Sequence, residues 1–158
     1  MPRIAISGHR GLPEDTSRLI DGAIRALLAA RASDVVGISC LADGADQLFA
    51  RAVVDNGGAL EVVVPADDYR DGLPAEVREE YDALLARAVR VHRLDFADST
   101  SAAHMAAGHL MLDHADELWA VWDGLPARGY GGTADVVAAA RDRGLPVRVI
   151  WPAGARRD

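Results

Sequence analysis

Glycine-rich and charged segments directly follow several short apolar runs of this chain, and they carry residue types that bind phosphate. The first is Ser7–Gly11 (SGHRG), in which glycines let a ligand approach the backbone and Arg10 can bind an anion through two N–H groups. His9 in this segment is either a ligand contact or an ordinary packing or surface histidine. Two interpretations of the whole segment stay open, a phosphate contact and a plain tight turn.

The most specific segment precedes the last predicted helix, and extends from Asp123 and Gly124 to Gly131, Gly132 and Thr133. Consecutive glycines followed by a threonine at a helix start present backbone amides and a hydroxyl to a phosphate group. Glycines also stand on both sides of Tyr130, which exceeds what a helix cap requires. The pattern therefore favours ligand binding over helix capping.

Three other segments contribute carboxylates and a hydroxyl. Asp43, Gly44 and Asp46 follow the second apolar run, where a carboxylate either binds a sugar hydroxyl or caps the next helix. Asp67 follows the third run, and Ser99 precedes a later helix, again with a solvated loop or a helix cap as the alternative. The complete set of predicted ligand-binding residues is Ser7, Gly8, His9, Arg10, Asp43, Gly44, Asp46, Asp67, Ser99, Asp123, Gly124, Gly131, Gly132 and Thr133.

The sequence predicts no metal and no cofactor. His104 lies about one turn inside a predicted helix, whereas His109 and His114 lie farther along it, and their spacing matches no common set of metal ligands. Cys40 is the single cysteine, and we expect a buried, inert thiol there.

Six runs rich in β-branched residues alternate with alanine-rich segments of helical spacing, and these elements must position the loops. The runs are Arg3–Ser7, Val35–Ser39, Leu60–Val64, Val89–Leu94, Leu118–Trp122 and Val147–Trp151. Because the runs are nearly all apolar, they predict a three-layer, doubly wound, mostly parallel α/β sheet of Rossmann-like type, with residues 1–158 as a single domain. In such sheets ligands bind beyond the C-terminal ends of the strands, where these loops lie.

Composition bears on partners and location. The chain has 158 residues, with 17 basic side chains, all arginine, against 24 acidic ones, so the net charge is −7 and nucleic acid is an unfavourable partner. No apolar run is long enough to cross a bilayer, and the start of the chain lacks a signal-peptide pattern, so we expect a cytoplasmic protein without membrane contact. The apolar side chains of Met105, Leu110 and Met111 are expected in the core, with a dimer interface as the alternative.

Segments across nearly the whole chain resemble the SLOG superfamily. They are ISGHR, GISCLADGADQLFARAVVDNGG, EVVVPADDYRD, and HADELWAVWDG followed by GYGGTADVVAAARDRGLPVRVIWP. This Rossmann-like group contains the LOG phosphoribohydrolases, the DprA/Smf DNA-processing proteins, molybdenum-cofactor carriers and stand-alone nucleotide sensors. The resemblance implies a nucleotide-type ligand bound by the same loops and, as in many members, a homodimer.

Departures from the LOG pattern P-G-G-x-G-T-x-x-E bear on the choice of function. The glutamate of that pattern acts in N-glycosidic bond cleavage, and its position holds Val136 here, with Asp135 one residue earlier and about 100° around the helix. The positions of the LOG arginine-lysine pair hold Ala107 and Gly108. The resemblance therefore favours a sensor or carrier that binds a nucleotide or nucleotide derivative.

Two other functions are kept as alternatives. The first is an N-glycoside hydrolase acting on nucleoside monophosphates, with Asp135 or Asp43 as the carboxylate and His9 or His104 as the acid. The other is a partner-binding protein that uses aromatic side chains expected to be exposed, Tyr69 and Tyr130.

Overall fold

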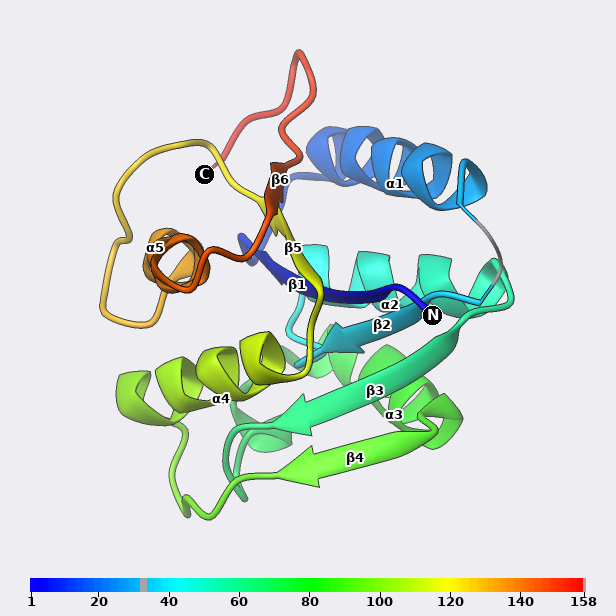
Figure 1. Cartoon of the computed structure of the whole chain (residues 1–158). Helices are drawn as coiled ribbons and strands as arrows, with labels where there is room; N and C mark the ends of the chain where they lie inside the picture. The colour runs from blue at the N-terminus through cyan, green and yellow to red at the C-terminus, as the bar shows by residue number, and fades with distance from the viewer. Residues whose placement is uncertain (32–33, 158) are drawn as a thin grey trace.

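The computed structural model describes residues 1–31 and 34–157, and in this part of the chain six strands form one parallel sheet (Figure 1). The strands are β1 (Arg3–Gly8), β2 (Val36–Ser39), β3 (Ala59–Val64), β4 (Arg90–Arg93), β5 (Glu117–Val121) and β6 (Val147–Val149). Their order across the sheet is β4-β3-β2-β1-β5-β6, and every neighbouring pair is parallel. The predicted doubly wound α/β fold and its six strands are confirmed.

Helices cover both faces of the sheet. They are α1 (Glu14–Ala29), α2 (Ala45–Asp55), α3 (Arg78–Arg87), α4 (Ser101–Asp113) and α5 (Thr133–Asp142), with short 3-10 turns at Arg70–Gly72 and Ala75–Val77. The first three helices lie on one face, and α4 and α5 lie on the other (Figure 1). None of the helices in the described residues is long and apolar enough to span a bilayer.

Successive side chains of β1 belong to the two layers of the core in turn. Ile4 and Ile6 pack with Ile20 and Ile24 of α1, whereas Ala5 between them belongs to the cluster on the opposite side. Successive side chains of a strand point to opposite faces, so a strand covered on both sides has to be apolar at consecutive positions. This explains why the strands read as continuous apolar runs.

The strand order reverses beside β1, and this reversal places the important loops. The chain moves outward from β1 to β4 and then returns to pair β5 with the other side of β1, so that Gly8 lies opposite Val121. The His9 N–H donates to the carbonyl of Val121 at 3.1 Å. The loops after β1 and β5 therefore leave the sheet at the same point, where open α/β sheets form their ligand crevice.

A close approach of two backbones joins the loops after β1 and β2. A Cβ at Gly8 would lie 2.3 Å from the Cβ of Ala45, and one at Gly44 would lie 2.6 Å from the His9 carbonyl oxygen. Gly44 also has φ +85°, a left-handed conformation that glycine adopts without strain. Glycine is needed at both positions for the two loops to meet.

Candidate functional site

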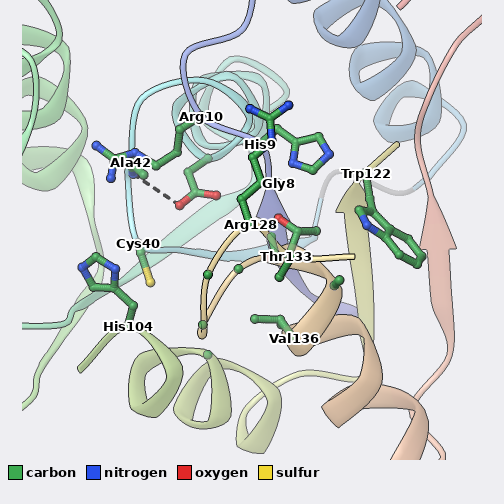
Figure 2. Close-up of a pocket in the computed structure, with 18 of the residues that line it drawn as sticks. Gly8, His9, Arg10, Cys40, Ala42, His104, Trp122, Arg128, Thr133 and Val136 are labelled. Atoms are coloured by element: carbon green, nitrogen blue, oxygen red, sulfur yellow. Dashed lines mark hydrogen bonds between the residues drawn. The ribbon is translucent and has the colours of Figure 1, made fainter. Parts of the chain in front are cut away.

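A cavity of about 330 Å³ lies at this C-terminal edge of the sheet (Figure 2). Its wall comes from the end of β1 and the loop after it, the segment from the end of β2 to the start of α2, the loop after β3, helix α4, the segment from Trp122 to the start of α5, and Arg157. The predicted residues that line it are Ser7, Gly8, His9, Arg10, Asp46, His104, Gly131, Gly132 and Thr133. These residues come from four separate segments of the sequence, which the fold brings together.

The other predicted residues lie outside the cavity wall in the described structure. They are Asp43, Gly44, Asp67, Ser99, Asp123, Gly124 and Asp135. Asp43, Ser99 and Asp123 hold the side chains of Arg10, His104 and His9 respectively. Their polar atoms support the side chains that line the cavity.

Asp43 connects the loops after β1 and β2. Its carboxylate accepts from Arg10 Nε at 2.8 Å and from the Gly11 N–H at 3.0 Å. Gly44 is the N-cap residue of α2, and the helix has no side-chain cap. The capping interpretation of Asp43 is therefore wrong, because its oxygens are used to orient the arginine.

Asp46 is a buried carboxylate in the cavity wall. Its Oδ2 accepts from the Ala42 N–H at 3.3 Å, the dashed line in Figure 2, so it does not cap its own helix either. Burial raises the pKa of Asp46 to about 7, although the Ala42 bond and Arg10 favour the ionised form. Near neutral pH this group can donate a hydrogen bond to a ligand when protonated and accept one when ionised.

His9 is enclosed between Asp123 and Trp151. Its Nε2 accepts from the Asp123 N–H at 3.0 Å and lies 3.2 Å from Asp123 Oδ1, while the Trp151 ring packs edge-on at 5.6 Å between ring centres. Burial, together with the positive charge of Arg157, lowers the pKa of His9. A neutral ring whose Nε2 accepts this bond carries its proton on Nδ1.

Asp123 remains ionised beside it. Burial opposes the charge of this carboxylate, but a hydrogen bond from the Leu125 N–H and the proximity of His9 outweigh burial and lower the pKa of Asp123. The pair therefore combines a neutral imidazole with a carboxylate.

His104 lies on the α4 side of the cavity. Ser99 Oγ is 2.7 Å from His104 Nε2, and Tyr69 packs edge-on against the ring. Burial and the charge of Arg10 lower the pKa of His104. Thr100 is the residue that caps α4, since its Oγ1 accepts from the Ala103 N–H at 3.1 Å.

The position of the LOG glutamate is apolar in this chain. Val136 lines the cavity and is almost completely buried, and a Cβ at Gly108 would lie 3.2 Å from its Cγ2. Asp135 lies outside the cavity wall, and its Oδ2 accepts from the Gly131 N–H at 2.9 Å. The carboxylate nearest the LOG position thus holds the glycine segment in place.

Cys40 and Met111 complete this apolar part of the wall. The Cys40 Sγ lies 3.8 Å from the Met111 Sδ, and burial raises the pKa of the thiol well above its ordinary value. Cys40 is therefore a buried, neutral thiol, as predicted. In the described residues, no three His, Cys, Asp or Glu side chains are grouped as metal ligands would be.

Several solved structures have a fold similar to that of this chain. DNA processing protein A of Streptococcus pneumoniae matches with a TM-score of 0.70 and 17% identity, over 98% of this chain and 52% of that chain. The same protein of Helicobacter pylori, which binds single-stranded DNA, matches with a TM-score of 0.70 and 15% identity. The match covers 98% of this chain and 67% of that chain. The molybdenum cofactor binding protein of Rippkaea orientalis matches with a TM-score of 0.63 and 12% identity. The match covers 96% of this chain and 77% of that chain.

The chain has the same fold as these proteins. It spans about half the length of the Streptococcus protein, and at these identities the likeness concerns the fold alone. No family model matches the chain, and no curated protein sequence matches it.

Sequence reasoning missed several residues of the cavity. Tyr69 lines it and is only 4% exposed, so its predicted exposure is wrong, whereas Tyr130 is exposed as predicted and also lines the cavity. Arg128 adjoins the glycine segment and could have been included with it. Arg157 could not, because it reaches the cavity only through the return of the chain after β6.

The charged side chains that line the cavity are mostly basic. Among the described residues its lining includes Arg10, Arg128 and Arg157, whereas Asp46 is the one carboxylate. The chain as a whole carries a net charge of −7. Three guanidinium groups thus line the cavity, and Asp43 and Asp123 lie behind Arg10 and Arg157.

Proposed function

We propose that this chain binds a nucleotide or nucleotide-derived ligand in the cavity, as a sensor or a carrier. The observation that carries the proposal is a wall with three arginines and one carboxylate in an otherwise acidic chain. A volume of about 330 Å³ falls within the range of small-molecule sites. The fold-level neighbours, which include proteins that bind single-stranded DNA or molybdenum cofactor, agree with a ligand of this class.

The phosphate side of the ligand is assigned to the start of α5. Gly131, Gly132, Thr133 and Ala134 line the cavity there, and the helix begins without a side-chain cap. First-turn amides without a cap, and the positive end of the helix dipole, favour an anion. Arg10, oriented by Asp43, supplies a charged donor from the loop after β1.

The sugar and base side is assigned to Asp46, His104 and the apolar surface around Val136. Asp46 can bind a hydroxyl or amino group in either protonation state, and Val136 and Met111 offer an apolar surface to a ring. Asp43 and Gly44 were expected on the sugar side as well, but they support the wall from behind.

The geometry supports binding more strongly than hydrolysis. The carboxylates expected to act as catalysts, Asp135 and Asp43, already accept hydrogen bonds from Gly131 and from Arg10 and Gly11. Val136 occupies the position of the LOG glutamate. Hydrolysis would therefore have to use Asp46 with His9 or His104, the titratable groups of this set that line the cavity.

Thermal unfolding with a ligand panel tests the proposal. The panel comprises AMP, GMP, cyclic nucleotides, NAD, ADP-ribose and a short single-stranded oligonucleotide, and each mixture is then assayed for released base. A ligand at 100 times its Kd adds about 2.7 kcal/mol, which raises the Tm of a domain of this size by roughly 5 to 10 °C. No shift with any nucleotide at millimolar concentration would refute the proposal. Released base would replace it with the hydrolase.

The oligomeric state is a separate question. Met105 and Met111 are buried within the fold, and Leu110 is partly buried against the same core. Homodimer formation, which the SLOG resemblance implies, is tested by light scattering with and without the ligand.

A further inference from the structure

The segment after β6 passes the start of α1 and returns toward the cavity. Figure 1 shows it turning back from β6 toward the loop that follows β5. Thr16 of α1 fastens it, because the Thr16 hydroxyl donates to the Arg156 carbonyl at 3.1 Å and accepts from the Arg156 N–H at 3.0 Å. Thr16 is fully buried, which protects both bonds from water.

Arg157, the next residue, lines the cavity with most of its donors unused. Its side chain is 21% exposed, and within residues 1–31 and 34–157 its ion-pair partner is Asp123, at 3.8 Å between Nη1 and Oδ2. That distance is too long for a hydrogen bond. Arg10, by contrast, is 46% exposed and has a hydrogen bond to Asp43 at 2.8 Å.

The part-exposed guanidinium of Arg157 can take an acceptor from a ligand. It presents five N–H groups in a planar fork. Asp123 is already engaged, since its Oδ1 accepts from the Leu125 N–H and lies beside His9. The fork matches the geometry of phosphate or carboxylate oxygens.

We propose that Arg157 binds an anionic oxygen group of the ligand on the His9 side of the cavity, and that Thr16 positions it by fastening residues 150–157 to α1. This inference rests on the proposed function and deepens it. It assigns the anionic group a contact that is separate from the glycine segment at α5 and from Arg10.

The test uses pyrophosphate as the probe, with binding followed by calorimetry and by the NMR signals of the His9 ring. Arg157→Gln is expected to weaken pyrophosphate binding about 10- to 100-fold, the usual effect of losing a charge-assisted hydrogen bond. Arg148→Gln is the matched control, because it removes the same charge from an exposed position on β6 outside the cavity wall; its affinity is expected to stay within about twofold.

Variants at Thr16 test the positioning role. Thr16→Val keeps the shape of the side chain but removes both bonds to Arg156, and we expect a loss of affinity of about 3- to 10-fold. Thr16→Ser restores the hydroxyl and should recover most of the affinity. Thr16→Val that binds pyrophosphate as well as the wild type would overturn the role of Thr16.

A second readout does not depend on any ligand. The charge of Arg157 helps to lower the pKa of His9, so Arg157→Gln should raise that pKa while Arg148→Gln should leave it unchanged. An unchanged pKa in Arg157→Gln would show that the guanidinium does not face His9, and would overturn the inference.

The outcomes separate this inference from the proposed function. If nucleotides bind equally well to the wild type and Arg157→Gln, the inference is overturned and the function stands. If pyrophosphate binds through Arg157 but no nucleotide binds, the function is overturned and the inference stands. If pyrophosphate does not bind the wild type, the inference is overturned whatever the nucleotides do.

Discussion

Asp46→Asn should change how the stability of the chain depends on pH. Burial raises the pKa of Asp46 from 3.8 to about 7, so between these values the folded chain keeps a proton that the unfolded chain has lost. Stability is therefore lost as the pH rises through this window. Three pKa units at about 1.4 kcal/mol each give a cost of about 4 kcal/mol for ionising Asp46 in the folded chain above pH 7.

Asparagine avoids this cost and keeps an oxygen that can accept from the Ala42 N–H. The free energy of unfolding of Asp46→Asn, measured against that of the wild type, should therefore rise by about 3 kcal/mol between pH 5 and pH 8.5. Urea denaturation followed by tryptophan fluorescence measures both proteins across this range. A difference in the free energy of unfolding between Asp46→Asn and the wild type that stays the same at every pH reflects packing and carries no information about ionisation.

A raised pKa of Asp46 would be refuted if the free energies of unfolding of Asp46→Asn and of the wild type changed in parallel with pH. It would also be refuted if the carboxyl ¹³C signal of Asp46 titrated near pH 4 in the folded protein. A midpoint near pH 7 that disappears on ligand binding would further show that the ligand contacts this carboxyl.

Four other predictions concern the glycine loops, helix α1 and the site. Thr133→Val should weaken binding of any nucleotide found in the panel by about 5- to 10-fold with little change in Tm, as measured by calorimetry, because it removes one hydroxyl from the start of α5; equal affinity would remove Thr133 from the site. Gly8→Ala should lower the free energy of unfolding by about 1 to 3 kcal/mol in urea, because its Cβ would lie 2.3 Å from that of Ala45. Gly22→Ala in α1, with open space around it, should instead raise stability by about 0.5 to 1 kcal/mol. His9 should titrate below pH 6.5 by NMR, so the neutral ring stabilises the fold above that pH and stability is lost as the pH falls; a midpoint above 6.5 would contradict the burial argument.

The sequence was sufficient to identify the strands and the loops that meet. Continuous apolar runs require a sheet covered on both faces, and the doubly wound connection then brings Gly8 and the segment at Gly131 to one edge. It was not sufficient to predict which way each polar side chain points. Asp43 precedes a left-handed Gly44, and its carboxylate meets Arg10 behind the cavity wall.

Contacts between distant segments account for most of the remaining errors. The hydrogen bonds between Thr16 and Arg156 join residues 140 positions apart, and no local sequence pattern indicates them. Tyr69 follows a strand in a charged segment, which suggests an exposed ring, yet it packs against Tyr81 and His104. The burial of Tyr69 depends on the helices that pack against its loop, α3 and α4, and their positions follow from the whole fold rather than from the local sequence.

The contact between Gly108 and Val136 also limits how this chain can evolve. A side chain at position 108 would begin 3.2 Å from Val136 Cγ2, so even alanine would force a shift of a few tenths of an ångström. A larger residue at either position is tolerated best when the other becomes smaller in the same lineage. A cation at position 108 together with a larger acid at position 136 would enlarge both sides of this contact, so packing in this chain disfavours that pair whatever chemistry it would bring.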